Sequence, residues 1–206
     1  IVIDDECMCH VAFGRQIHLD DTPDDDQWSY FPYSDGLVFW SEGQPALDTA
    51  TITAEILPSD WSTHPLYLNG QLAAWTQENG DDTISAVAPY FASLTSMPSI
   101  AYHKDAMGYD VFQIFYSALS VGFVNPDPEA PDNFRHIWGR YTEGDGMWSE
   151  FTDYTGDIFH LFLESAYPSV SQNVVNGQYD ILYQTDALPG NALQPTDPHH
   201  LPVLNQ

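Results

Sequence analysis

Closely spaced oxygen-bearing side chains make residues 78–84 the best candidate for an ion site in this sequence. The segment follows a predicted strand at residues 71–76 and places Glu78, Asn79, Asp81 and Asp82 around a glycine. Hard cations such as Ca²⁺ take about six to eight oxygen ligands, although the segment lacks the Glu that closes an EF-hand loop. We therefore expect a calcium site at these four residues, with an ordinary Asn-Gly turn as the alternative.

No residue pattern identifies a catalytic site, so the catalytic residues stay unknown. The sequence contains no Gly-x-Ser-x-Gly, His-Glu-x-x-His or Gly-x-Gly-x-x-Gly motif. Its 30 acidic residues make any particular carboxylate spacing uninformative. Cys7 and Cys9 are expected to be reduced and to lie on one face of a strand, and a metal site with His10 is the alternative.

The charge of the chain excludes two classes of partner. Four Lys and Arg residues stand against 30 Asp and Glu residues, which leaves a formal charge of −26. Nucleic acids and anionic membranes attract clustered cations, so neither is an expected partner, and no apolar run is long enough to span a bilayer. Self-repulsion among so many carboxylates is relieved by salt or divalent cations, which favours an extracellular or cell-surface location.

Short apolar and aromatic runs separated by Gly, Pro, Asn and Asp predict an all-β fold with little helix. The expected strands cover residues 8–13, 71–76, 110–117, 136–141, 157–163 and 180–185. Residues 1–187 form one β-repeat region in this interpretation. Residues 188–206 carry four prolines and are expected to form an extended tail.

Two short segments of the sequence recur further along the chain, and this internal repeat, here called the sequence echo, is the main sign of a repeated structural unit. Residues 97–101, Met-Pro-Ser-Ile-Ala, recur as residues 167–171, Tyr-Pro-Ser-Val-Ser, and Tyr-Asp-Val at 109–111 recurs as Tyr-Asp-Ile at 179–181. Both matches have the same offset of 70 residues. Two matches in one register indicate one supersecondary unit used twice.

Residues 133–141, 144–153, 164–171 and 179–190 resemble the propeller region of large secreted Bacteroidota proteins that carry type IX secretion sorting tails. The resemblance implies propeller-like blades of short antiparallel strands, and about three blades would fit this chain as part of a larger propeller. A β-sandwich is the alternative. A C-terminal sorting domain, which the resemblance also implies, does not follow Gln206 in this sequence.

Two turns resemble degenerate Asp-boxes, the hairpin turns of sialidase-type propellers. Each keeps an Asp-Gly pair and a nearby Trp, and the residues are Asp35, Gly36 and Trp40 in one turn and Asp145, Gly146 and Trp148 in the other. The resemblance gives these residues a structural role, in which the Asp caps backbone N–H groups and the Trp packs between blades.

The arginine inventory argues against sialidase activity, because sialidases clamp the substrate carboxylate with three arginines. This chain has Arg15, Arg135 and Arg140. Side chains alternate along a strand, so Arg135 and Arg140 should face opposite sides unless Gly139 forms a bulge. We expect them to be ion-paired structural residues.

The leading interpretation is a non-catalytic extracellular module for binding or assembly, with a glycan, a surface or a protein as its partner. A carbohydrate-active, sialidase-like hydrolase with part of its site outside this chain is the second hypothesis, and a subunit of a surface filament is the third. Three blades leave an open propeller edge. The remainder of a longer polypeptide, another copy or a surface protein should cover it, so the purified chain should not be a monodisperse monomer.

Overall fold

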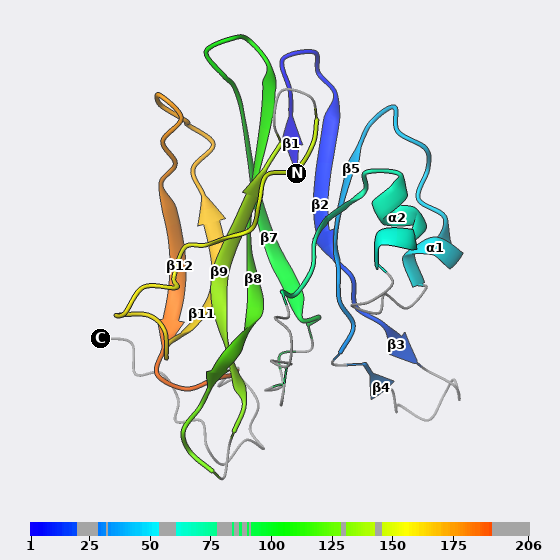
Figure 1. Ribbon diagram of the computed structural model, residues 1–206. Helices are drawn as coiled ribbons and strands as arrows, with labels where there is room; N and C mark the ends of the chain where they lie inside the picture. The colour runs from blue at the N-terminus through cyan, green and yellow to red at the C-terminus, as the bar shows by residue number, and fades with distance from the viewer. Residues whose placement is uncertain are drawn as a thin grey trace.

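A computed structural model describes residues 1–19, 29–31, 33–53, 61–77, 84, 87, 90, 92–128, 131–142 and 146–190 (Figure 1). Strands dominate this part of the chain. They are β1 (Val2–Ile3), β2 (Cys9–Gly14), β3 (His18–Leu19), β4 (Ser29–Tyr30), β5 (Leu37–Ser41), β6 (Leu72–Ala74), β7 (Thr95–Lys104), β8 (Asp110–Val124), β9 (Asn133–Tyr141), β10 (Thr152–Asp153), β11 (Glu164–Val170) and β12 (Ile181–Asp186). Its helices are α1 (Thr49–Thr53), the 3-10 turn η1 (Trp61–Thr63) and α2 (Pro65–Leu68).

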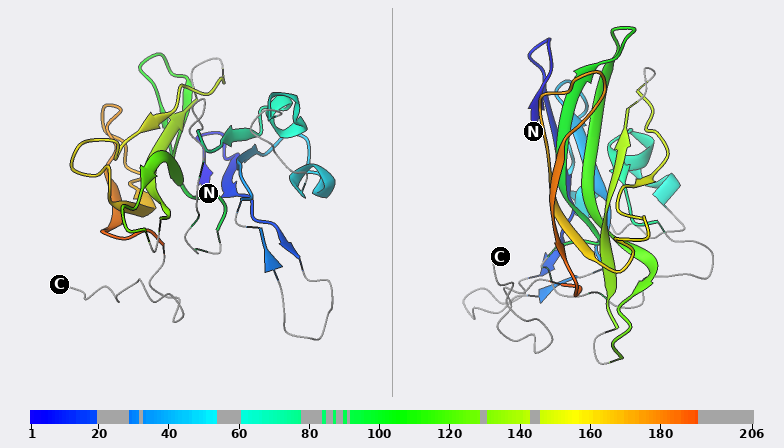
Figure 2. Two further views of the ribbon diagram at one scale, coloured as in Figure 1. Left: turned by 60° about the horizontal axis from the view of Figure 1, so that its bottom comes forward. Right: turned by 90° about the vertical axis from the view of Figure 1, so that its left-hand side faces the viewer.

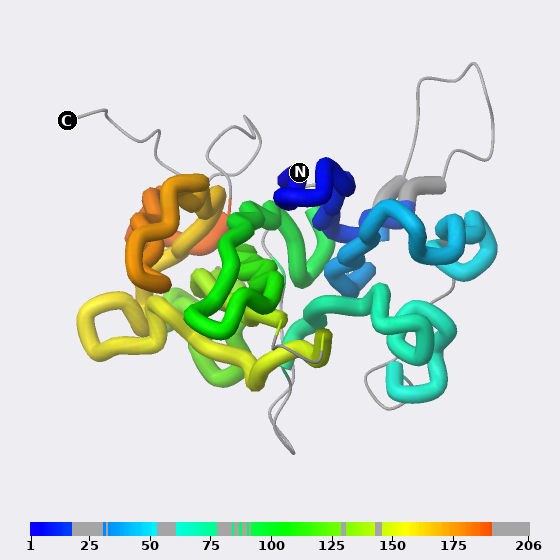
Figure 3. The backbone as a smooth tube through the Cα atoms, turned by 90° about the horizontal axis from the view of Figure 1, so that it is seen from above, coloured from blue at the N-terminus to red at the C-terminus, as the bar shows by residue number. Residues whose placement is uncertain are grey.

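Three antiparallel sheets are stacked face to face. The N-terminal sheet has the order β1-β2-β5-β6, the central sheet β10-β9-β8-β7 and the C-terminal sheet β11-β12. Strand β2 packs on β7, and β11 packs on β7, β8 and β9, so the central sheet lies between the other two (Figure 3). The expected all-β fold is confirmed. Among the described residues, no helix is long and apolar enough to cross a membrane.

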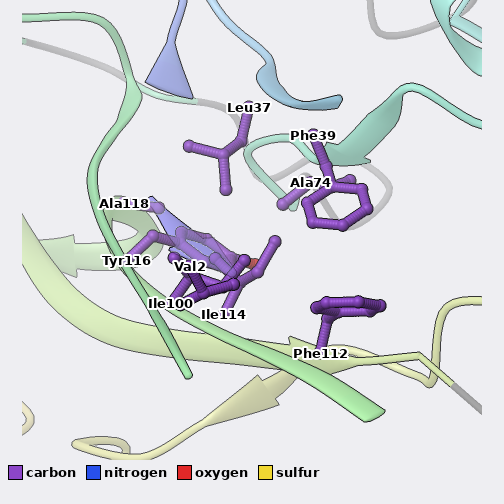
Figure 4. Packing of buried hydrophobic residues seen from close by; sticks show 10 residues of the cluster. Val2, Leu37, Phe39, Ala74, Ile100, Phe112, Ile114, Tyr116 and Ala118 are labelled. Atoms are coloured by element: carbon purple, nitrogen blue, oxygen red, sulfur yellow. The ribbon is translucent and has the colours of Figure 1, made fainter. Parts of the chain in front are cut away.

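Strand β8 is buried on both faces because a sheet covers each of them. Its run Asp-Val-Phe-Gln-Ile-Phe-Tyr-Ser continues as apolar and small residues, as expected of a strand without a solvent face. Phe112 and Ile114 point into the core shared with Leu37 and Phe39 of the N-terminal sheet (Figure 4). Phe115 packs with residues of the C-terminal sheet in a second cluster.

Helix α2 covers the other face of the N-terminal sheet. Leu66 is buried against Val38 and Leu72, and the rings of Trp61 and Trp75 stack at 4.1 Å beside them. Pro65 occupies the first turn of α2, where a helix tolerates a residue without an N–H. The His64 side chain precedes it and accepts the N–H of Leu66.

The first half of the sequence echo has the same backbone geometry in both places. Met97 and Tyr167 each precede a proline, and each has a left-handed φ of 54°. Each also lies at a register shift, one in the β7–β8 pair and one in the β11–β12 pair. A proline has no N–H to donate, so a bulge is where a paired strand accommodates it.

The second half of the echo is not in the same ladder register. Ile100 pairs with Ile114, whereas its counterpart Val170 pairs with Ile181. Ile181 therefore pairs at the position that Ile114 occupies in the β7–β8 pair. The sequence echo, by contrast, aligns Ile181 with Val111. The first strands of the two hairpins, β7 and β11, have the same local backbone geometry. The loops that connect them to β8 and β12 differ in length.

The turns that join β1 to β2 and β7 to β8 have the same hydrogen bonds. The Asp4 carboxylate accepts two backbone N–H groups two and four residues ahead, and the Asp105 carboxylate does the same, at 2.8 to 3.0 Å. Cys7 and Gly108 occupy the left-handed positions, with φ of 63° and 86°. The expectation that Cys7 lies in a strand is therefore wrong: its positive φ belongs to a turn, while Cys9 starts β2.

The strand expected at residues 157–163 is also wrong. The Asp157 carboxylate accepts the N–H of Phe159 at 2.8 Å, and its carbonyl accepts the N–H groups of His160 and Leu161. This local capping winds the chain into turns that project from the stack (Figures 2 and 3, yellow). Ile158 and Phe159 are each 82% exposed. Apolar composition alone could not distinguish this turn from a buried strand.

Candidate functional site

An open groove of about 850 Å³ lies between the central sheet and the hairpin β11–β12. Its aromatic lining comes from both sides. Phe115 lies on β8, Tyr141 ends β9, Tyr154 follows β10, and Tyr179 precedes β12. His103 of β7 and Gln113 of β8 supply polar groups to the same groove.

Two tyrosine rings stand at steep angles to a buried phenylalanine. Phe115 is 1% exposed, and the rings of Tyr154 and Tyr179 meet it edge to face, at 5.2 and 5.7 Å between centroids. Such edge-to-face pairs hold aromatic rings in defined orientations. The groove therefore has an aromatic floor and two fixed aromatic side chains from different sheets.

The backbone around Tyr154 is tied to β9. Its N–H donates to the carbonyl of Ile137 at 2.8 Å, and the N–H of Ile137 donates to the hydroxyl of Thr155. Gly139 makes room for the ring, since a Cβ at Gly139 would come within 2.7 Å of Tyr154 Cε2 and 3.1 Å of Gln113 Nε2. Any larger residue at this position would displace the groove wall.

Tyr179 is held by a hydrogen bond across the sheets. Its hydroxyl and Nδ1 of His103 are 2.9 Å apart, and the two rings also meet edge to face. Burial raises the pKa of Tyr179 to about 12 and lowers the pKa of His103. At neutral pH the tyrosine hydroxyl is thus protonated and the imidazole is neutral.

Two carboxylates lie at the groove. The Asp105 carboxylate is committed to the β7–β8 turn, where it accepts the N–H groups of Met107 and Tyr109. Asp180 is exposed. No lysine or arginine is among the residues that line the groove in the described part of the chain.

None of the predicted site residues that the structure describes lines this groove. Glu78, Asn79, Asp81 and Asp82, the candidate calcium ligands, lie outside the described residues, and so does Asp145. Within the described ranges, no three His, Cys, Asp or Glu side chains are arranged to hold a metal ion.

The first Asp-box-like turn lies in the N-terminal sheet. The half-buried carboxylate of Asp35 accepts the N–H of Gly36 at 2.7 Å and the N–H of Thr76 at 2.9 Å. Gly36 has a φ of 102°, which favours glycine. Trp40 donates its ring N–H to the carbonyl of Pro45. These contacts tie the turn to the end of β6.

The second Asp-box-like turn reaches the N-terminal sheet through its tryptophan. Gly146 has a φ of 80°. Trp148 meets Phe39 edge to face at 5.3 Å between ring centroids, so its ring packs between the N-terminal and central sheets. Arg140 donates to the carbonyls of Ala73, Trp148 and Ser149 beside it.

The three arginines lie in separate places. Between Arg135 and Arg140, β9 pairs with β8 without a register shift, so the two side chains face opposite sides as expected. Arg135 is fully buried and donates to the carbonyls of Ser93 and Leu94, and Arg15 donates to those of Asp35 and Ile52. Because each guanidinium mainly satisfies backbone carbonyls, the three do not form a carboxylate clamp.

A buried carboxylate lies beside Arg135. Glu164 accepts the N–H of Arg135 at 2.7 Å and lies next to the hydroxyl of Tyr90. Burial raises the pKa of Glu164 to about 7, against the opposing effect of the Arg135 charge. These three residue types could serve a hydrolase, but Glu164 is 2% exposed and Arg135 is 0% exposed, so a substrate has no access.

Glu164 should make stability depend on pH. Its pKa is raised in the folded state, so its ionisation opposes folding, and the free energy of unfolding should fall by about 3 kcal/mol as pH rises from about 4.5 to about 7. Glu164→Gln should remove most of this dependence, as measured by urea unfolding at a series of pH values. Glu6→Gln, at an exposed carboxylate, should leave it in place. Equal slopes in both variants would contradict the assignment.

Comparison with known proteins gave no relative: no protein family, no curated protein and no solved structure matches this chain.

Proposed function

We propose that this chain is a non-catalytic binding module of an extracellular or cell-surface protein, and that its ligand binds in the groove between the central and C-terminal sheets. The observation that carries the proposal is the fixed position of Tyr154 and Tyr179 over Phe115. Binding sites are commonly concave and largely apolar with a few placed polar groups. His103 and Asp180 are two of the polar groups that line this site.

The carboxylates favour binding over hydrolysis. A glycosidase needs two carboxyl groups that flank the scissile bond and act as acid and base or nucleophile. Asp105 is held in the β7–β8 turn by two backbone N–H groups, which leaves Asp180 as the carboxylate free to act on a ligand among the described groove residues. A hydrolase with its other catalytic residues outside this chain is the competing hypothesis.

Fluorogenic glycosides separate the two hypotheses. For a binding module we expect no turnover of these substrates by the purified chain. Turnover that Asp180→Asn abolishes would support the hydrolase instead. Asp127→Asn, outside the groove, is the control for a general effect of removing a charge.

The stacked sheets support a propeller-like arrangement, in which each sheet is a blade or part of one. Each four-stranded sheet is antiparallel, as a blade is, and the C-terminal sheet has two strands. Leu182, on the face of that sheet away from the stack, is 76% exposed. We propose that this side is covered in the complete assembly by the remainder of a longer polypeptide, another copy or a surface protein, because about three blades leave a propeller open.

Calcium and salt should both stabilise the protein. The charge of −26 opposes compaction, and the proposed ligands Glu78, Asn79, Asp81 and Asp82 offer clustered oxygens. We expect the Tm to rise in millimolar calcium and in molar sodium chloride. Asp81→Ala should abolish the calcium response and preserve the salt response. An unchanged Tm under both conditions would contradict the proposal.

A further inference from the structure

We propose that the ligand of the groove is a neutral carbohydrate, whose pyranose ring stacks on Tyr154 and whose hydroxyls are held by His103 and Asp180. This inference rests on the proposed binding function and names its ligand class.

The exposed tyrosine rings match the apolar face of a sugar. Tyr154 is 46% exposed and Tyr141 is 41% exposed, although both line the groove. Pyranoses present patches of C–H groups on their faces and hydroxyls around their edges. A flat ring that is apolar in its body and polar at its hydroxyl suits both features. The contact of Tyr154 with Phe115 and the space over Gly139 hold the ring in place before a ligand binds.

The polar groups of the groove suit hydroxyls, which both donate and accept hydrogen bonds. The imidazole of His103 is neutral at pH 7, because burial lowers its pKa. Its Nδ1 is paired with the Tyr179 hydroxyl, which leaves Nε2 for a hydroxyl of the ligand. Asp180 is exposed, and its carboxylate accepts hydrogen bonds. Gln113 is 3% exposed and its amide donates to the carbonyl of Ile114, so it belongs to the groove wall and does not contact the ligand.

Charge decides against ionic ligands. The groove-lining residues described here include Asp105 and Asp180 but no lysine or arginine, in a chain with a charge of −26, so sialylated, uronic or phosphorylated sugars are repelled. A cation would bind aromatic rings and carboxylates. However, the Asp105 carboxylate is already committed to two backbone N–H groups, and Gln113 and His103 are neutral.

The size of the groove fits the end of an oligosaccharide. Its volume of about 850 Å³ lies in the range of drug-sized ligand sites, roughly 300–1,000 Å³. The groove is open to solvent, so a chain of sugars can continue into solvent beyond the rings bound against the tyrosines.

The test uses the full 206-residue chain with three sets of probes. The neutral set contains disaccharides and oligosaccharides of glucose, galactose, mannose and xylose. The anionic set contains sialylated and uronic acid oligosaccharides. The cationic set contains Nα-acetyllysine amide and its trimethyllysine analogue. Binding is measured by calorimetry and located by chemical-shift changes of groove residues. We expect at least one neutral sugar to bind, and the anionic sugars not to bind.

Matched tyrosine variants assign the site. Tyr154→Leu keeps an apolar side chain but removes the planar ring, and it should weaken sugar binding by roughly tenfold. Tyr109→Leu changes a tyrosine of similar exposure at the tip of the β7–β8 hairpin, outside the groove, and should leave the affinity unchanged. Gly139→Ala should also weaken binding, because it displaces the Tyr154 ring. Circular dichroism and Tm identify a variant that fails to fold.

The outcomes separate the ligand class from the binding function. Binding of an anionic or cationic probe in the groove, with loss in Tyr154→Leu, would overturn the carbohydrate inference and leave the binding function standing. Binding of a neutral sugar that is insensitive to Tyr154→Leu and Gly139→Ala would overturn the site. Absence of any groove binding across the three sets would overturn both.

Discussion

Replacing Arg135 with Met is expected to lower the free energy of unfolding at pH 8 by about 3–5 kcal/mol, because it removes the buried cation beside the Glu164 carboxylate and the donor to two backbone carbonyls. The guanidinium is fully buried and donates to the carbonyls of Leu94 and Ser93 at 3.1 and 2.9 Å. Its positive charge also opposes the rise in the pKa of Glu164 that burial causes. Without Arg135, these carbonyls lose a donor and Glu164 loses its nearby cation.

A double variant isolates the charge component of this loss. Arg135→Met combined with Glu164→Gln should be more stable at pH 8 than Arg135→Met alone, since a neutral amide in place of the Glu164 carboxylate needs no cation. Arg140→Met is the matched control. Arg140 also donates to three backbone carbonyls, so its loss should be destabilising. Glu164→Gln should change the stability of Arg140→Met only as much as it changes that of the unsubstituted chain, whereas its effect on Arg135→Met should be larger. Urea unfolding of the single and double variants measures both couplings, and strictly additive losses for Arg135 and Glu164 would contradict the pairing.

Truncating Phe115 to Ala should cost about 3–5 kcal/mol, because it opens a cavity in a core that is closed on both faces of β8. Phe115 packs with Ala101 and Val170, so its loss weakens the contact between the central and C-terminal sheets. It also supports the rings of Tyr154 and Tyr179, and its removal should weaken ligand binding in the groove.

Neighbouring aliphatic residues on β12 provide the controls for Phe115→Ala. Ile181 is partly buried against the Phe115 cluster, so Ile181→Ala should cost less than Phe115→Ala. Leu182 points away from the stack and is 76% exposed, so Leu182→Ala should change stability by less than about 0.5 kcal/mol. Equal losses at Ile181 and Leu182 would contradict the placement of the C-terminal sheet on the central one.

Strands could be predicted from the sequence where both faces of the strand are buried, because such a strand consists of a continuous apolar run. The run at residues 110–117 lies in β8, and the residues at 136–141 lie in β9. The segment at 157–163 has a similar composition but forms an exposed turn. Asp157 caps this segment through local hydrogen bonds, which are an alternative to pairing with a strand. No strand among the described residues pairs with the backbone of this segment.

The groove could not be predicted in the same way. Its residues come from positions as distant as His103, Tyr154 and Tyr179, and no spacing in the sequence links them. The sequence allows a bulge at Gly139, whereas in the structure the missing side chain of Gly139 makes room for the Tyr154 ring. A tyrosine-rich composition was visible, but which tyrosines share a surface was not.

The sequence by itself determined the β-rich class, the burial of β8 and the opposite facing of Arg135 and Arg140, because side-chain alternation and apolar runs are local properties of a strand. Only the tertiary structure decided that β11 packs across β7, β8 and β9, and that Tyr154 and Tyr179 meet at Phe115. These contacts depend on how sheets stack, which is set by the combined shape and burial of residues far apart in the chain.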